Sequence, residues 1–331
     1  MRHQILLDVD TGRDDALAIM FAMRHPDIDV HAITCVAGNT SAANAAANTL
    51  RILDLVEAPP IPVAVGAQRP LIEPLRDASW IHGPNGLGDV DLPVSGRGIE
   101  PVHAVELMRR CLLSSEARLT VIALGPMTNV ALLLRTYPEV AGRIERIIFM
   151  GGSATVGNAT PAAEFNFWHD PEAAHIVLTS GIPLTMYGWD ILWSMRTGAH
   201  QIAELCDSAD QVRQIAGRLL AFAAADPANG SPVIYDCIGD AGVLCVMAAP
   251  ELFGIESRPV QVVLTPGPAR GQTIVDQREM AGEDSAHGMT APVPLVDVVT
   301  SASNNEVLAM FLETLDGRCG CDNGASHHAE R

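Results

Sequence analysis

The chain has 331 residues, of which 48% are apolar and 4% aromatic, and it carries a formal net charge of −18 with 21 basic residues, all of them arginine. This length accommodates one large α/β domain or two small ones. The acidic balance argues against nucleic acid or an anionic membrane as a partner, because both require basic patches. The first apolar run is too short for a secretory signal and no run is long enough to span a bilayer, so we expect a cytoplasmic protein.

Strand-like and helix-like segments alternate along the chain. Apolar runs typical of buried strands occupy residues 4–9, 30–36, 61–66, 119–124, 146–150, 183–188, 259–264 and 272–276. Helical patterns occupy 14–25, 41–57, 101–114, 127–136, 171–180, 198–225, 237–249 and 305–315, and two Gly-rich loops cover 67–99 and 151–163. This alternation predicts an α/β fold with a single open, mostly parallel or mixed central sheet, Rossmann-like, with helices on both faces.

The same pattern predicts one domain over residues 1–316, because neither an internal repeat nor a linker interrupts it. Residues 317–331 are polar, and we expect them to form a disordered C-terminal tail. The tail contains Cys319, Cys321, His327 and His328. These residues could bind a metal, although their spacing matches no common zinc pattern.

The first predicted strand ends in a cluster of carboxylates, Asp8, Asp10, Asp14 and Asp15. Ligand sites of open α/β sheets lie outside the carboxyl ends of the strands, which is where these acids fall. Clustered carboxylates repel one another unless a cation or a proton joins them, and a hard divalent ion such as Ca²⁺ or Mg²⁺ is the natural partner. A simpler interpretation is that Asp14 and Asp15 only favour the positive end of a helix. That interpretation would account for two of the acids and not for four.

Polar clusters follow other predicted strands as well, at Gly38-Asn39, at residues 124–129, at residues 157–166 and at Tyr235-Asp236. Because strand ends gather on one edge of a parallel sheet, these clusters can converge. Together they supply carboxylates and amides, and Arg13 is the one cationic residue among them. Such a set suits a metal and a neutral, hydroxyl-rich ligand such as a sugar, and does not suit a phosphate.

The run Asp8-Val9-Asp10-Thr11-Gly12-Arg13-Asp14-Asp15-Ala16 resembles the D-x-D-x-G-x-D-D-A signature of the inosine–uridine-type nucleoside hydrolases. Further blocks resemble the family in its order: residues 36–39, 81–83, 125–129, 150–152, 157–160, 163–166, 170–174 and 270–273. The resemblance covers about residues 3–315. It implies that the protein hydrolyses the N-glycosidic bond of ribonucleosides to ribose and a free base, and that it assembles as a homodimer or homotetramer.

The resemblance also implies a tightly held Ca²⁺ ion at the bottom of the substrate pocket. By position, Asp10, Asp15 and Asp236 would supply carboxylates to it, and Leu124 a main-chain carbonyl. Mixed oxygen ligands of this kind are what Ca²⁺ accepts. Asp10 would in addition take the proton of the attacking water, whose pKa the ion lowers.

Further positions that match the family would hold the ribose. The residues expected near the 2′- and 3′-hydroxyls are Asp14, Asn39 and Asn166, and those expected near the 5′-hydroxyl are Asn158 and Glu164. Glycosidic cleavage places positive charge on the sugar ring. A ring of carboxylates and amide oxygens would stabilise that charge as it develops.

Departure of the base is where the sequence differs from the best-known members, which often carry His directly before the last Asp ligand. This chain has Tyr235 there, and tyrosine is a poorer proton donor near neutrality than histidine. His82, in a loop where the family contacts the base, is a second candidate for the residue that helps the base to leave. The loops at 76–98 and 222–235 are expected to surround the base, and the aromatic residues that could stack on it are Trp80, Trp168, Trp189 and Trp193.

Two other functions fit parts of the sequence. A nucleoside- or ribose-binding homologue would keep the calcium and sugar sites and lose hydrolysis through the change to Tyr235. A phosphatase of the haloacid dehalogenase type would use Asp8 as nucleophile with Mg²⁺, because residues 6–11 match its D-x-D-x-T motif. That chemistry usually needs a cation for the phosphoryl group, and the lack of lysine counts against it.

Overall fold

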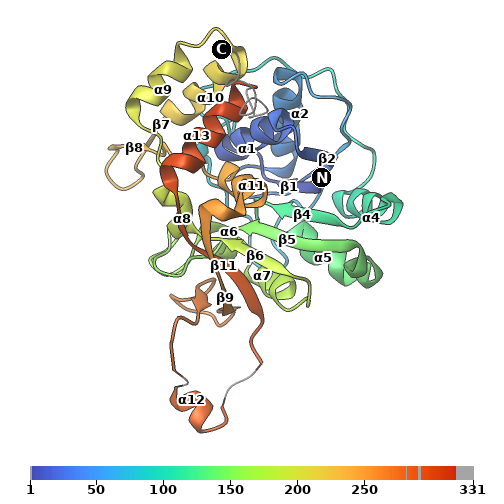
Figure 1. Cartoon of the computed structure of the whole chain (residues 1–331), viewed down its shortest axis with the longest axis vertical. Helices are drawn as coiled ribbons and strands as arrows, with labels where there is room; N and C mark the ends of the chain where they lie inside the picture. The colour runs from blue at the N-terminus through green and yellow to red at the C-terminus, as the bar shows by residue number, and fades with distance from the viewer. Residues whose placement is uncertain (1, 281, 290–291, 318–331) are drawn as a thin grey trace, which may run out of the picture.

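A nine-stranded sheet forms the centre of the residues that this computed structural model describes, 2–280, 282–289 and 292–317. The strand order is β10-β9-β11-β6-β5-β4-β1-β2-β3 (Figure 1). Neighbouring strands are parallel from β3 through to β11, and β9 and β10 add antiparallel pairs at one edge. The strands are β1 (His3–Val9), β2 (Ile28–Cys35), β3 (Val63–Val65), β4 (Leu119–Ala123), β5 (Ile144–Met150), β6 (Leu184–Tyr187), β9 (Phe253–Val262), β10 (Thr273–Val275) and β11 (Leu295–Ala302).

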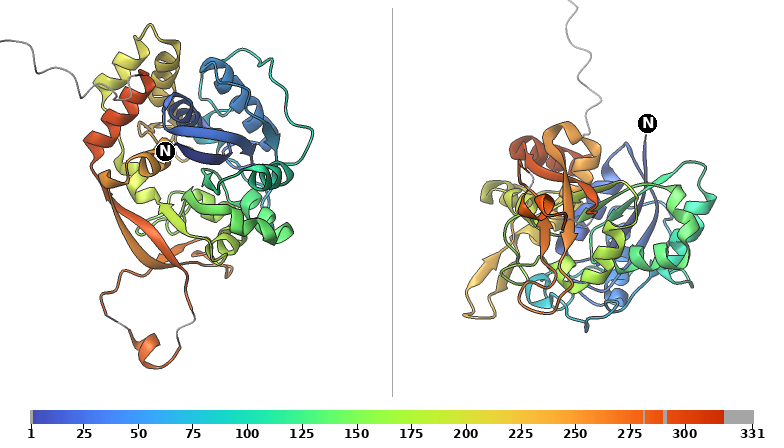
Figure 2. Two further views of the ribbon diagram at one scale, coloured as in Figure 1. Left: turned by 45° about the vertical axis from the view of Figure 1, so that its right-hand side comes forward. Right: turned by 90° about the horizontal axis from the view of Figure 1, so that it is seen from below.

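Two apolar cores lie on the two faces of the sheet because successive strand residues point to opposite sides. In β1, Ile5 and Leu7 belong to one core and Leu6 to the other. The first core packs under α1 (Arg13–Arg24), α2 (Ala42–Leu55), α10 (Gln211–Ala221), α11 (Ala241–Ala248) and α13 (Asn304–Leu315). The second packs under α4 (Ala104–Ser114), α5 (Thr128–Thr136) and α7 (Pro171–Leu178), on the other side of the sheet (Figures 1 and 2). The predicted mixed sheet with helices on both faces is confirmed.

Smaller elements lie outside the nine-stranded sheet. A separate hairpin pairs β7 (Ala223–Ala225) with β8 (Pro232–Ile234). Short helices complete the described chain: α3 (Ser79–His82), α6 (Phe165–His169), α8 (Trp189–Ser194), α9 (Ala199–Cys206), α12 (Glu283–Ala286), and the 3₁₀ turns Pro138–Arg143 and Pro250–Leu252. No helix among the described residues is both long enough and apolar enough to cross a bilayer.

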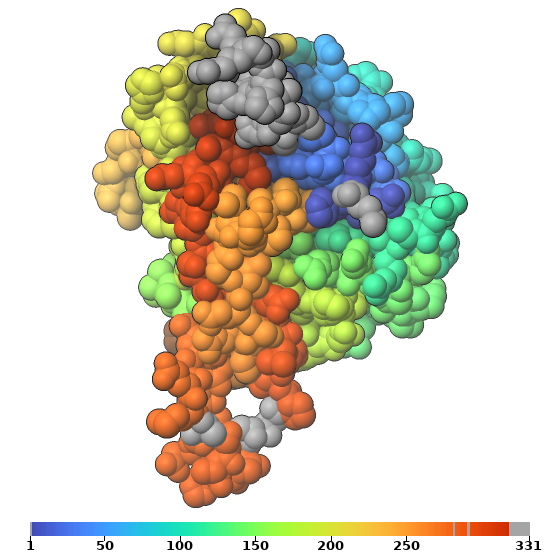
Figure 3. Space-filling view, in the orientation of Figure 1, coloured from blue at the N-terminus to red at the C-terminus, as the bar shows by residue number. Residues whose placement is uncertain are grey.

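Several predicted boundaries are wrong. The helix expected over 198–225 is two helices, because the side chain of Asp210 accepts backbone N–H groups and caps the start of α10, and residues 223–225 belong to the hairpin. The helix expected from 237 begins only at Ala241, after a left-handed glycine at Gly239. Strand β11 was absent from the predicted elements, as was α12, in the segment that projects from the body between β10 and β11 (Figure 3). Most of the predicted tail, with Cys319, Cys321, His327 and His328, lies outside the described residues.

Candidate active site

A cavity of about 210 Å³ lies beside the carboxyl ends of the central strands. Leu124 follows β4 and Met150 ends β5, and both line the cavity together with Asn39, which follows β2. This is the edge of an α/β sheet at which ligands bind. Of the residues predicted to form the site, those that line the cavity are Asp14, Asn39, His82, Leu124, Asn158, Glu164, Asn166 and Tyr235.

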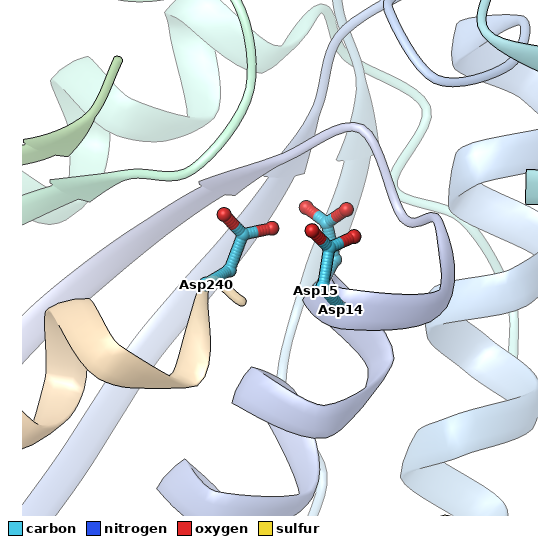
Figure 4. Close-up of side chains that lie close together, drawn as sticks. All are labelled: Asp14, Asp15 and Asp240. Carbon is cyan, nitrogen blue, oxygen red and sulfur yellow. The ribbon is translucent and has the colours of Figure 1, made fainter. Parts of the chain in front are cut away.

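Three carboxylates meet at one end of the cavity. Asp14 and Asp15 come from the first turn of α1, and Asp240 stands at the start of α11 (Figure 4). One carboxylate oxygen from each lies within 4.8 Å of the others. Asp15 and Asp240 are almost fully buried, at 0% and 3% exposed, so their charges have little water to stabilise them. The spacing allows one cation to contact all three.

Asp10 is joined to this group by hydrogen bonds to Asp15 and Asn39. Its Oδ2 accepts the backbone N–H of Asn39 at 2.6 Å, while its Oδ1 is buried without a hydrogen-bond partner. Asp15 accepts the backbone N–H groups of Asp10 at 3.1 Å and Gly12 at 2.9 Å, and the side-chain amide of Asn39 at 3.0 Å. A buried carboxylate oxygen without a partner is costly unless a ligand satisfies it. The free Asp10 oxygen therefore favours a bound cation.

The electrostatics lead to the same conclusion. Burial raises the pKa of Asp15 to about 7, with the neighbouring carboxylate of Asp14 adding to the effect. Burial and the nearby acids also raise the pKa values of Asp10 and Asp240 well above their usual range. Such shifts mean that burial first, and the neighbouring carboxylates second, disfavour the negative charges in the folded chain. A divalent cation would offset both effects, so the donor set fits a hard metal ion.

Asp236, predicted as a metal ligand, is not part of the group formed by Asp14, Asp15 and Asp240. Its Oδ1 is 2.6 Å from Nη2 of Arg196, an ion pair that is not aligned as a hydrogen bond. Asp240 stands in its place in the carboxylate group, because Gly239 adopts a φ of 55° and turns the chain into the start of α11. A Cβ at Gly239 would overlap the side chain of Asp14. A Gly-Asp pair before an apolar helix was the signal that could have identified Asp240 from the sequence.

The main-chain carbonyl of Leu124 lies in the cavity wall, where Asn166 holds it. The side-chain amide of Asn166 donates to this carbonyl at 2.8 Å and to the carbonyl of Met150 at 3.0 Å. A carbonyl oxygen has two lone pairs. The Leu124 carbonyl oxygen can therefore accept a hydrogen bond from Asn166 with one lone pair and offer the other lone pair to a cation.

The remaining predicted sugar-binding residues are fixed by backbone hydrogen bonds. Glu164 caps α6 and accepts N–H groups from Gly152 at 2.8 Å and Asn166 at 2.9 Å. Burial raises the pKa of Glu164 to about 7 in spite of these bonds. Asn158 accepts the N–H of Phe165 at 2.8 Å, which leaves its amide N–H groups for other partners. Asn158 reaches the cavity from the second Gly-rich loop, and Glu164 reaches it from the start of α6.

His82 and Tyr235 line the cavity from two neighbouring elements, α3 and the end of the β7–β8 hairpin. Nδ1 of His82 accepts the backbone N–H of Arg13 at 3.2 Å, and burial lowers the pKa of this imidazole to about 4. Its proton is thus assigned to Nε2. Tyr235 packs edge-on against Trp193 at 5.1 Å between ring centroids, and burial raises the pKa of its hydroxyl.

The four tryptophans named as stacking candidates divide into two groups. Trp80, Trp168 and Trp189 line the cavity. Trp193 is not among the lining residues, and its ring stacks on Trp189 at 5.2 Å between centroids. Trp193 therefore supports the cavity wall without forming it.

Asp8 does not line the cavity. Its Oδ1 accepts the hydroxyl of Thr34 at 2.6 Å and the side-chain amide of Asn129 at 2.8 Å, and its exposure is 0%. It thus joins β1 to β2 and to α5 beneath the site. A buried carboxylate with these bonds has no access to a phosphoryl group, which argues against the phosphatase interpretation.

A known family matches almost the whole chain. The model of the inosine-uridine preferring nucleoside hydrolases covers residues 5–309. The chain belongs to this family. Among relatives, the pyrimidine-specific ribonucleoside hydrolase RihA of Photobacterium profundum is 38% identical over 286 residues, 85% of this chain and 91% of the relative. RihA of Escherichia coli O127:H6 is 39% identical over 288 residues, with the same shares covered.

Solved structures show the same fold. A plant nucleoside hydrolase, PpNRh1, superposes with a TM-score of 0.84 at 26% identity over 95% of this chain and 99% of the plant chain. A purine-preferring ribonucleoside hydrolase from Gardnerella vaginalis gives a TM-score of 0.82 at 28% identity, over 95% of this chain and 98% of that one. The predicted family is confirmed, and the phosphatase interpretation is wrong. The chain is an N-glycosyl hydrolase of ribonucleosides.

Proposed function

We propose that this enzyme cleaves ribonucleosides to ribose and base with a Ca²⁺ ion held at the carboxylate end of the cavity. The observation that carries the proposal is the buried carboxylate group with its unpartnered Asp10 oxygen. The ligands would be Asp10, Asp15, Asp240 and the Leu124 carbonyl. Their oxygens come from separate segments and are all anionic or neutral, a set that suits the flexible coordination of Ca²⁺.

When bound, the ion would offset the carboxylate charges and lower the pKa of a water molecule in its shell. Asp10 takes the proton of the attacking water, with its carboxylate oriented by the backbone N–H of Asn39 that donates to Oδ2. The water approaches from the carboxylate end, and the base leaves on the other side of the sugar. This geometry predicts inversion at the anomeric carbon.

The sugar would lie across the carboxylates. Asp14, Asn39 and Asn166 line the cavity. Asp14 would accept hydrogen bonds from the 2′- and 3′-hydroxyls, and the two amides would donate or accept hydrogen bonds there. Asn158 and Glu164 serve the 5′-hydroxyl from the loop before α6. As the glycosidic bond breaks, these oxygens surround the positive charge that develops on the ring and stabilise it.

The base would lie against α3 and the hairpin. His82 offers Nε2–H as a hydrogen-bond donor, and Tyr235 offers a hydroxyl, while Trp80, Trp168 and Trp189 provide faces for stacking. The RihA relatives are named pyrimidine-specific, and we therefore propose uridine as a substrate.

A release assay tests this function. The protein would be incubated with uridine, cytidine, inosine and adenosine, and free ribose measured by a reducing-sugar assay. We expect ribose from at least one nucleoside, loss of activity in EDTA and recovery with Ca²⁺. A protein that releases ribose equally well after exhaustive chelation would contradict the metal role.

One observation favours a second function. With Asp240 as the last carboxylate, the position where other members often carry His is Gly239 and not Tyr235, and glycine has no side chain that could donate a proton. A nucleoside-binding homologue would keep the sugar site without supplying a proton to the base. Saturable binding of a nucleoside in calorimetry, with no ribose released over many hours, would support this second function.

We also propose that the protein assembles as a homodimer or homotetramer, an expectation that rests on the resemblance to the family. Light scattering on the purified full chain would test it. A monomer at micromolar concentration would contradict it.

A further inference from the structure

One cation faces the cavity. Among the described residues that line it, the acids are Asp14, Asp77, Glu164 and Asp240, and Arg13 is the sole Arg or Lys. We propose that the Arg13 guanidinium stabilises the negative charge that develops on the departing base, a role that rests on the proposed hydrolysis.

The side chain of Arg13 is held in place by its surroundings. Its Nη1–H donates to the carbonyl of Leu219 at 2.9 Å, and its Cζ lies 5.0 Å from the ring centroid of Phe222. Leu219 lies near the end of α10, and Phe222 directly precedes the hairpin. Both are next to the segment expected to surround the base. The residue is only 5% exposed, so the cation is positioned without competition from bulk water.

The guanidinium retains unused hydrogen-bonding capacity. Its Nε–H is buried and has no hydrogen-bond partner in the described structure. A buried donor without a partner is costly, and a ligand atom that accepts from it recovers that cost. Guanidinium donors suit anionic or carbonyl oxygens, which the common oxo-substituted bases carry.

The placement of charge matches the electron flow of the reaction. The bond between C1′ and the base nitrogen breaks, and its electron pair moves to the base. The water oxygen bonds to C1′ and gives its proton to Asp10, and the departing base anion takes a proton from solvent. In the proposed orientation the sugar becomes positive beside Asp15 and Asp240, while the base becomes negative beside Arg13, with Asp14 between the two. Fixed charges that match a developing dipole lower the barrier without reorganisation.

Other groups near the base are less suited to this task. The Nδ1 of His82 already accepts the backbone N–H of Arg13, so the ring presents a neutral N–H. Gly239 has no side chain, and a Cβ there would overlap Asp14. Arg13 supplies a full charge in this part of the cavity.

The test compares two substrates that differ in their need for help with the leaving group. Uridine releases a poor leaving group, whereas p-nitrophenyl β-D-ribofuranoside releases a stable phenolate and needs no stabilisation. We expect Arg13→Gln to lower kcat on uridine by about 100-fold and on the nitrophenyl riboside by less than about 3-fold. Arg218→Gln, which removes an equal charge from the exposed face of α10, is the matched control and should change neither.

Two further readouts separate charge stabilisation from a structural role. Arg13→Lys should recover part of the uridine rate, and added guanidinium ion should raise the uridine rate of Arg13→Ala. Equal losses on both substrates, or no loss on uridine, would overturn this inference and leave the proposed hydrolysis intact. If the wild type released ribose from neither substrate, the proposed hydrolysis itself would fall, and the role of Arg13 with it.

Discussion

The two ends of the cavity are built in different ways. The carboxylate end (Asp10, Asp14, Asp15 and Asp240) stands on strand ends and the starts of two helices, with backbone N–H groups fixing its oxygens. The end near α3 and the β7–β8 hairpin, here called the flap wall, is made of a short helix, a hairpin and the side chain of Arg13. The sheet itself places the carboxylate end, whereas contacts between loops place the flap wall. In the proposed mechanism, this contrast separates the attack on the sugar from the departure of the base.

The largest expected effect is at the carboxylate end. Asp10→Asn removes the base that accepts the proton of water while keeping the side-chain shape. We expect kcat on uridine to fall by about 10³-fold or more, because general bases contribute roughly 10²–10⁴ and this one is also a proposed ligand of the cation. Thermal unfolding should show a folded variant. A variant that keeps most of its kcat would remove Asp10 from the mechanism.

A matched pair of variants tests the reassignment of the third carboxylate. Asp240→Asn should weaken Ca²⁺ binding by about 10–100-fold or more, whereas Asp236→Asn should leave it nearly unchanged because its partner is Arg196. Isothermal titration with CaCl₂ measures both. Should Asp236→Asn be the variant that loses calcium, the sequence-based assignment would be restored.

The pH dependence of stability probes the same end. The folded pKa of Asp15 is about 7, raised above its unfolded value near 4, so the folded chain holds its proton more tightly. The stability contributed by this proton is present below pH 4 and is lost as pH rises through 7. We expect the Tm of the chelated protein to fall by roughly 5 °C over this interval.

Added Ca²⁺ supplies the control for this profile. Because the cation replaces the proton, it should raise the Tm most at pH 8 and least at pH 4. A chelated protein whose Tm rises steadily from pH 4 to 8 would contradict the raised pKa of Asp15.

The smallest effects are expected at two residues of the flap wall other than Arg13, namely Tyr235 and His82. Tyr235→Phe removes only a hydroxyl that packs beside Trp193, and we expect kcat on uridine to fall by less than about 10-fold. His82→Asn keeps a hydrogen-bond donor and should show a loss of similar size. A loss above about 100-fold in Tyr235→Phe, without a change on the nitrophenyl riboside, would identify Tyr235 as the proton donor.

The same contrast explains what the sequence could predict. Asp10, Asp14 and Asp15 follow a buried strand within a few positions, so local pattern and sheet topology are enough to place them. Asn39 was placed by the same rule, because it follows the neighbouring parallel strand. The fold class followed from the alternation of apolar runs, which depends on short-range patterns.

The features that the sequence analysis did not predict depend on contacts or turns that only the folded chain shows. The grouping of Asp240, and not Asp236, with Asp14 and Asp15 depends on the backbone turn at Gly239, which glycine permits. The Gly-Asp pair before an apolar helix is a weak signal for this turn. The contact of Arg13 with Leu219 and Phe222 joins segments about two hundred positions apart, and it exists only once α10 has packed beside α1. The hairpin β7–β8 consists of three-residue strands too short to show alternation.

The central claim, that hydrolysis depends on a cation held by the buried carboxylates, is tested most directly by ribose release from uridine before and after chelation. The account predicts that the EDTA-stripped protein releases no ribose above background and that added Ca²⁺ restores release. Full activity in the stripped protein, with metal content verified by elemental analysis, would contradict it.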